Sequence, residues 1–141
     1  MSRVEKNKAL MRDFIDTWNR GDFDKLPSFW APDIVHHTRS SHNKERIMKS
    51  YETTMKAFPD LHWSIEDLFA EGDKVVMRLT GSATHLGEFL GTPPTGRKIT
   101  CRAVDICRVE DEKITEHWGM LDELQLLGEL ELVPAEYLSA M

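Results

Sequence analysis

Residues 98–121 read KITCRAVDICRVEDEKITEHWGML, and this stretch decides the fold that the sequence predicts. Two runs rich in β-branched and apolar residues, Lys98–Val109 and Lys113–Leu121, stand on either side of the polar segment Glu110–Glu112. Because only a few polar residues separate the two runs, we expect them to pair as an antiparallel hairpin.

The turn of this hairpin sets which side chains share a face of the sheet. If Asp111 and Glu112 form a two-residue turn, Glu110 lies opposite Lys113. Carried along both strands, that register pairs Asp105 with Trp118 and Cys101 with Asp122. One face then carries Asp105, Trp118, Met120 and Asp122, and the other face carries Arg108 and His117.

The same kinds of signal predict the elements around the hairpin. Apolar runs bounded by polar or Gly/Pro-rich segments indicate strands at Leu61–Ala70 and Lys74–His85. Helical spacing of apolar residues predicts three helices, which a short strand and a final helical segment complement: residues 3–19, Asp24–Trp30 and Lys44–Ala57, then Ile34–Thr38, and Asp122–Leu130. This order is typical of an α+β fold in which three N-terminal helices cover a strongly curved antiparallel sheet. Such a cone encloses a pocket.

The composition predicts one domain spanning residues 1–141. No apolar run approaches the roughly 20 residues of a membrane span, and the first residues lack the apolar stretch of a secretory signal, so we expect a cytoplasmic protein without a membrane partner. The formal charge of -6, with no basic run, argues against nucleic acid as a partner. Cys101 and Cys107 would lie about 20 Å apart along one strand, which predicts two reduced, buried thiols.

Asp122 is the first candidate for acid–base chemistry. A carboxylate that points into an apolar cavity has its charged form destabilised, which raises its pKa toward values useful for proton transfer. Asp122 also directly precedes the final helical segment, so a role as helix N-cap is the alternative.

Asp105 and His117 each allow two interpretations. Aspartate is depleted in the middle of strands, so Asp105 either contacts a ligand or forms an ion pair with Arg78 or Arg102. His117 is either a catalytic residue or a buried structural histidine in the core or at a dimer interface.

His36, His37 and His42 raise the question of a metal site, because imidazole is a common zinc ligand. Adjacent residues of a strand point to opposite faces, and no HExxH or CxxC motif accompanies the three histidines, so we expect no metal. One of the first two histidines is expected to face the pocket. His85, at the end of a predicted strand, either reaches the mouth of the cavity or caps the turn.

The remaining motifs are weaker. Gly91–Lys98 superficially resembles a phosphate loop, but its prolines lack N–H groups and its last two residues do not fit the motif, which favours a rim loop. Neither cysteine has the neighbours that activate a nucleophile, which disfavours covalent catalysis. Trp63 and Trp118 lie on predicted strands and are candidates to stack on a planar ligand.

Seven short segments occur in a family-specific order and spacing: Asn19–Asp22, Ala31–His37, Phe58–Leu61, Glu71–Val75, Thr84–Gly87, Pro94–Arg97 and Lys113–Asp122. Together they resemble the SnoaL-like polyketide and ester cyclases, a family with the nuclear transport factor 2-like cone fold. The resemblance covers nearly the whole chain. It implies a homodimer with a deep pocket and with neither a metal nor an organic cofactor.

The resemblance also implies roles for single residues. An aspartate at the position of Asp122 acts as acid and base in the aldol ring closure of a polyketide ester in that family, and His117, His37 and His85 match recurrent family positions. The hypothesis is therefore a cofactor-independent acid–base enzyme of cyclase, isomerase or hydrolase type, acting on an apolar, cyclic or aromatic carbonyl compound. Its catalytic residues would be Asp122 and His117, and its substrate contacts would be His37, Trp63, Arg78, His85, Asp105 and Trp118. The alternative is a non-catalytic protein that binds a hydrophobic small molecule in the same cavity, and related cone folds add hydroxylation or epoxide opening as a third possibility.

Overall fold

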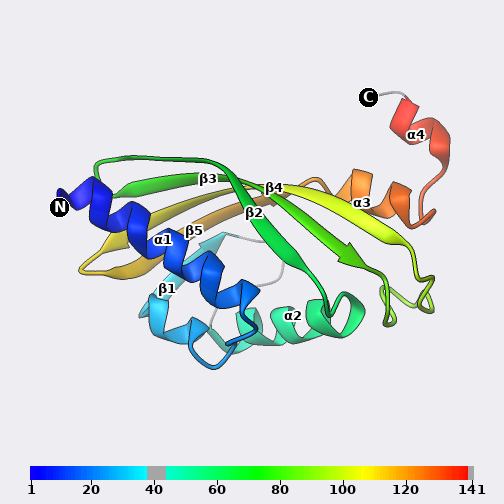
Figure 1. Cartoon of the computed structure of the whole chain (residues 1–141), viewed down its shortest axis with the longest axis horizontal. Helices are drawn as coiled ribbons and strands as arrows, with labels where there is room; N and C mark the ends of the chain where they lie inside the picture. Colours follow the sequence, from blue (N-terminus) through cyan, green and yellow to red (C-terminus); the bar gives the residue numbers. More distant parts are fainter. Residues whose placement is uncertain (38–43, 140–141) are drawn as a thin grey trace.

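A curved five-stranded sheet forms the centre of the computed structural model, which describes residues 1–37 and 44–139 (Figure 1). The strands stand in the spatial order β1 (Trp30–His37), β5 (Lys113–Leu121), β4 (Lys98–Glu110), β3 (Lys74–Thr84) and β2 (His62–Glu71). The last four pair antiparallel, as predicted, whereas β1 pairs parallel to β5. A parallel neighbour requires a long connection, so strand spacing in the sequence does not reveal it.

The two longest helices, α1 (Arg3–Asn19) and α2 (Lys44–Ala57), lie along the concave side of the sheet (Figure 1). The bounds predicted for both are confirmed. The predicted helix over residues 24–30 is wrong, because only the four residues of η1 (Leu26–Phe29) form a 3-10 turn. The chain enters β1 at Trp30, which leaves too few residues for a stable α-helix.

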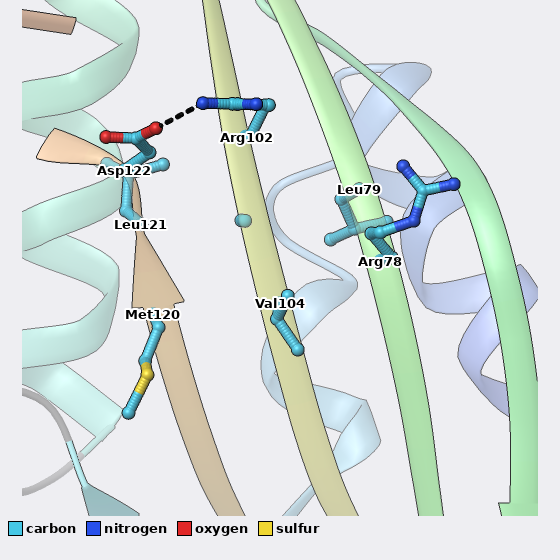
Figure 2. Close-up of a pocket in the computed structure, with 8 residues that line it drawn as sticks. Arg78, Leu79, Arg102, Val104, Met120, Leu121 and Asp122 are labelled. Atoms are coloured by element: carbon cyan, nitrogen blue, oxygen red, sulfur yellow. Dashed lines mark hydrogen bonds and ion pairs between the residues drawn. The ribbon is translucent and has the colours of Figure 1, made fainter. Parts of the chain in front are cut away.

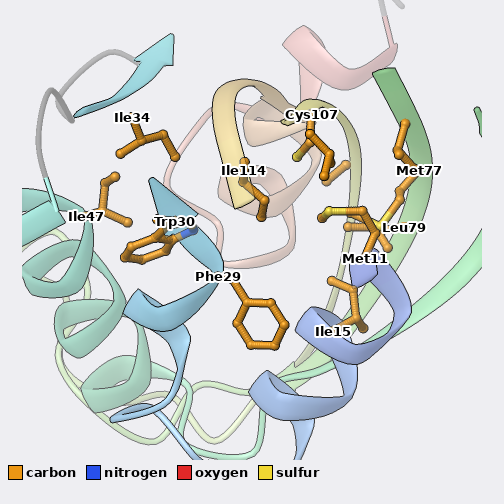
Figure 3. Packing of buried hydrophobic residues seen from close by; sticks show 13 residues of the cluster. Met11, Ile15, Phe29, Trp30, Ile34, Ile47, Met77, Leu79, Cys107 and Ile114 are labelled. Atoms are coloured by element: carbon orange, nitrogen blue, oxygen red, sulfur yellow. The ribbon is translucent and has the colours of Figure 1, made fainter. Parts of the chain in front are cut away.

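The apolar core fills the space between these helices and the sheet (Figure 3). Met11 and Ile15 of α1 belong to the same cluster as Met77 and Leu79 of β3. A second cluster continues the core toward the other end of the sheet and includes Trp18, Leu26, Phe58, Ile99, Cys101 and Leu126. The prediction for the two cysteines is confirmed, since both are buried free thiols.

Asn19 ties the end of α1 to the edge strand β2. Its amide Nδ2 donates to the carbonyl oxygen of Trp63 at 2.8 Å, and its Oδ1 accepts from the Trp63 backbone N–H at 2.9 Å. The side chain thus satisfies both backbone groups of one edge residue, as a neighbouring strand would.

The β4–β5 hairpin contains a bulge that changes the predicted register. Glu110 lies opposite Lys113 as predicted, but the register shifts between Arg108 and Val109. Because one extra residue moves every later side chain to the other face, the predicted pairs are wrong. Asp105 lies opposite Gly119 instead of Trp118, His117 lies opposite Cys107, and the Asp122 N–H donates to the carbonyl oxygen of Arg102 instead of pairing with Cys101.

Two short helices follow the sheet. α3 (Glu123–Glu129) corresponds to the predicted segment, whereas α4 (Ala135–Ser139), after Pro134, was not expected and lies at the far end of the chain (Figure 1). None of the helices in the described parts of the chain is both long and apolar enough to span a membrane.

The carboxylate of Asp60, just before β2, makes the stability of the fold depend on pH. The carboxylate accepts hydrogen bonds from the Thr84 hydroxyl and N–H, both at 2.7 Å, and these bonds lower the pKa of Asp60. A carboxyl with a lowered folded-state pKa stabilises the fold above its unfolded pKa of about 4, and this contribution is lost as the pH falls through the folded value. We expect Asp60→Asn to lower Tm at pH 7 and the difference from wild type to vanish in thermal scans below about pH 3. A difference in Tm that is equally large at both pH values contradicts this assignment.

Candidate active site

A small hollow of about 50 Å³ lies between the concave face of the sheet and the helices. Four elements each supply one polar side chain to it: His36 from β1, Tyr51 from α2, Asp105 from β4 and His117 from β5. The rest of the lining is apolar or weakly polar and consists of Met11, Phe14, Trp30, Met77, Cys107 and Ile114. Polar groups that converge in an apolar recess are characteristic of ligand sites.

Three of these polar side chains form a connected row. His117 Nε2 lies 3.4 Å from Asp105 Oδ1, and His117 Nδ1 lies 2.9 Å from Nδ1 of His36. The two imidazole rings are stacked, with centroids 4.3 Å apart and planes 22° apart. Only one of the two Nδ1 atoms can carry the proton of their hydrogen bond, so the second histidine accepts it. The row therefore fixes the orientation of His117 between a carboxylate and a second imidazole.

The two cysteines are poor nucleophiles in these surroundings. Burial, and then the nearby charge of Asp105, raises the pKa of Cys107 well above its usual value. Burial likewise raises the pKa of Cys101 to about 11. Because the thiolate is the reactive form, both side chains are inert near neutral pH.

Asp122 does not line this inner hollow, contrary to the sequence hypothesis. It borders a shallow depression of about 400 Å³ on the opposite side of the sheet, where its carboxylate pairs with Arg102 at 2.7 Å (Figure 2). Its Oδ1 also accepts the N–H of Gln125 at 3.2 Å, which makes Asp122 the N-cap of α3. Arg102, followed by the Gln125 N–H, lowers the pKa of Asp122, whereas the hypothesis required a raised value. The alternative role as N-cap is confirmed.

Trp118 and His37 also lie on the outer face, because the bulge separates Trp118 from Asp105. Their rings stack with centroids 5.0 Å apart and planes 8° apart. His37 Nε2 contacts Glu116 at 2.7 Å, and Arg108 contacts the other carboxylate oxygen at 3.2 Å. His37 and then Arg108 lower the pKa of Glu116, so this group is an ion-pair network.

A protein-family model that matches most of the chain identifies its family. The model of the SnoaL-like polyketide cyclases matches residues 8–130. The chain belongs to this family. The expected family and its nuclear transport factor 2-like fold are thus confirmed.

Several proteins similar to this SnoaL-like chain come from Streptomyces. AclR from Streptomyces galilaeus, solved as a candidate hydroxylase, has a TM-score of 0.87 and 36% identity over 93% of this chain and 99% of its own. IdmH from Streptomyces antibioticus, a candidate polyketide cyclase, has a TM-score of 0.80 and 29% identity over 89% of this chain and 98% of its own. The aklanonic acid methyl ester cyclase DauD of Streptomyces sp. (strain C5) is 25% identical over 123 residues, which are 82% of this chain and 75% of the cyclase.

Three further candidate contacts of the SnoaL-like chain lie outside the inner hollow. Arg78 is on the outer face, where its Nε donates to Asp67 at 2.6 Å. Trp63 packs against Gly81, since a Cβ added to that glycine would lie 2.8 Å from the indole ring. His85 is fully buried, and its Nδ1 accepts from the Thr95 N–H at 3.3 Å, which fits the turn-capping alternative.

His42, one of the three histidines considered as metal ligands, lies outside the described residues. Within residues 1–37 and 44–139, no group of three or more His, Cys, Asp or Glu side chains is placed to hold a metal ion. His36, one of the histidines considered for a metal, contacts His117 instead.

Two polar residues of the inner hollow, His36 and Tyr51, were not among the site residues predicted from the sequence. The alternation of His36 and His37 indicated that one imidazole faces inward, but only the parallel pairing of β1 with β5 shows that it is His36. Tyr51 is the one polar tip on the apolar stripe of α2, a signal that is also compatible with a plain core residue.

Proposed function

We propose that this chain is a cofactor-independent acid–base enzyme of the SnoaL-like ester cyclase type, acting on an apolar, cyclic or aromatic carbonyl compound. Asp105 and His117 are its acid–base pair, in place of Asp122. One observation carries the proposal: a carboxylate and an imidazole, 3.4 Å apart, stand together in an otherwise largely apolar recess. There, a substrate would displace water and strengthen every remaining electrostatic interaction.

The reaction requires only the movement of protons. Asp105 removes a proton from the carbon next to a carbonyl group, and the electron pair of that C–H bond moves into an enolate. The enolate carbon attacks a second carbonyl carbon of the same molecule, a carbon–carbon bond forms, and the new alkoxide takes the proton back. His117 holds Asp105 in position through Nε2 and can share the proton. No electrons enter or leave, so the ring closure needs no oxidant.

The size of the hollow limits how a substrate binds. About 50 Å³ holds a water molecule or a small chemical group, and it is much too small for a fused ring system. The proposal therefore places only the reacting end of the compound between Asp105 and the aromatic wall of Phe14 and Trp30. The rest of the compound lies at the open edge of the cone.

Proton exchange tests catalysis without knowledge of the natural substrate. A panel of aryl ketones and aryl keto esters in D2O, followed by proton NMR, reports loss of the α-proton signal. The proposal predicts faster exchange with the protein than with buffer for at least one compound. Saturable binding without faster exchange would favour the alternative, a non-catalytic binding protein. Oxygen uptake in the same samples would instead point to the reaction named for AclR.

We also propose that two copies of the chain pair through the outer face of the sheet. Val35, Phe69, Val104 and Met120 are 50%, 59%, 43% and 79% exposed there, and apolar side chains exposed on one face suit burial against a second copy of the same face. Val104 and Met120 lie directly opposite each other on β4 and β5 (Figure 2).

If the chain dimerises through this face, substitution of the cross-strand pair Val104 and Met120 should weaken the dimer. Changing Val104 and Met120 together to Glu is expected to raise the dimer dissociation constant at least about 100-fold, because both charges would be desolvated at the interface. Sedimentation equilibrium measures the constant, and the Val104→Ile, Met120→Leu double variant is the matched control. A wild-type monomer, or an unchanged constant in the double-Glu variant, contradicts the proposal.

A further inference from the structure

Tyr51 enters the hollow from the helical side, opposite the strand that carries Asp105. Its ring is fixed by two tryptophans: the centroid of Trp18 lies 4.6 Å away with the planes at 85°, and that of Trp30 lies 5.9 Å away at 60°. These edge-to-face contacts leave the ring little freedom to rotate away. The phenol is thus a fixed part of the site.

The hydroxyl of Tyr51 keeps its proton and can therefore donate a hydrogen bond. Burial, followed by the charges of Asp105 and Cys107, raises the pKa of Tyr51 far above its usual value, so the phenol keeps its proton at any pH near neutral. Within residues 1–37 and 44–139 this hydroxyl makes no hydrogen bond, and Tyr51 lines the hollow. A ligand in the hollow that accepts a hydrogen bond from this hydroxyl therefore gains affinity.

We propose that Tyr51 donates a hydrogen bond to the carbonyl oxygen of the bound compound and stabilises that oxygen as it becomes an enolate. This role rests on the function proposed above and adds Tyr51 to the catalytic pair of Asp105 and His117. Asp105 approaches the carbon from the sheet, and Tyr51 approaches the oxygen from α2. A fixed donor in a water-poor site binds the negative oxygen more strongly than the neutral one, which lowers the barrier to proton removal.

Binding of a stable enolate tests this role without any turnover. Cyclohexane-1,3-dione is an enolate at neutral pH, whereas cyclohexanone is its neutral analogue. We expect wild type to bind the dione more tightly, and Tyr51→Phe to lose about 10- to 100-fold in affinity for the dione with a much smaller change for cyclohexanone. Calorimetry measures both, and Tm confirms that the variant is folded. Tyr137→Phe, which alters the other tyrosine of the chain at 59% exposure, is the matched control.

Two further readouts make the result decisive. With only two tyrosines in the chain, ¹³Cζ-labelled tyrosine gives two NMR signals, and the signal lost in Tyr51→Phe is expected to shift when the dione binds. Asp105→Asn is expected to keep or improve dione affinity, because it removes a like charge. Equal affinity of wild type for dione and cyclohexanone, or an equal loss for both in Tyr51→Phe, overturns the proposal. Tight dione binding with no proton exchange would overturn the catalytic function and leave the role of Tyr51 intact.

Discussion

Replacing Asp105 with asparagine is expected to lower the rate of α-proton exchange about 10²- to 10⁴-fold, the usual contribution of a positioned general base. Asparagine has the same shape and can still accept a hydrogen bond from His117 Nε2, so the fold and the hollow should persist. The amide has no basicity near neutral pH, so the proton has no acceptor. Proton NMR in D2O with the best compound of the panel measures the effect.

Asp67→Asn is the matched control for this prediction. Asp67 lies on a strand of the same sheet but contacts Arg78 on the outer face, with a side chain 54% exposed. An exposed ion pair of this kind contributes little, so both stability and exchange should stay close to wild type. Equal losses of exchange in the two variants would mean that the effect comes from the charge of the protein as a whole and would contradict the role of Asp105.

Replacing Gly87 with alanine is expected to give the largest loss of stability among these variants. The backbone N–H groups of Leu86 and Gly87 both donate to the carbonyl oxygen of Ala57, at 2.9 and 3.1 Å, at the end of α2. An alanine Cβ at this position would lie 1.9 Å from the carbonyl oxygen of Lys56, so the loop must move away from the helix. We expect the free energy of unfolding to fall by about 3 kcal/mol, and Tm by about 6 to 12 °C.

Thermal and urea unfolding check this value, with Glu88→Ala as the control. Glu88 is the next residue, and its side chain is exposed. Its replacement should change the free energy of unfolding by less than about 0.5 kcal/mol. If Gly87→Ala and Glu88→Ala are equally stable, the loop does not depend on close contact with the end of α2.

The elements with strong periodicity could be predicted from the sequence. α1, α2 and β5 have the predicted bounds, because apolar side chains at regular spacing identify the face of an element that is buried. The segment of residues 24–30 has apolar residues too, but its length and the entry into β1 allow only a 3-10 turn. The structure of this segment is therefore determined by the entry of the chain into the sheet and not by its local pattern of apolar residues.

The site was harder to predict because it depends on one inserted residue. The bulge between Arg108 and Val109 has no clear sequence signal, and it moves His117 to the face that carries Asp105 while Trp118 moves away. The choice between the two roles of Asp122 depends on Arg102 and the N–H of Gln125, whose positions follow from the same register. The types of residue were predicted, but their grouping required the structure.

In the proposed reaction, proton transfer occurs in the inner hollow and not at Asp122. One comparison tests it most directly: α-proton exchange by Asp105→Asn and Asp122→Asn in the same assay. Asparagine is a good N-cap, so the second variant should keep α3 in place. We expect exchange within about threefold of wild type for Asp122→Asn and a loss of about 10²-fold or more for Asp105→Asn. The reverse order of the two variants would contradict it.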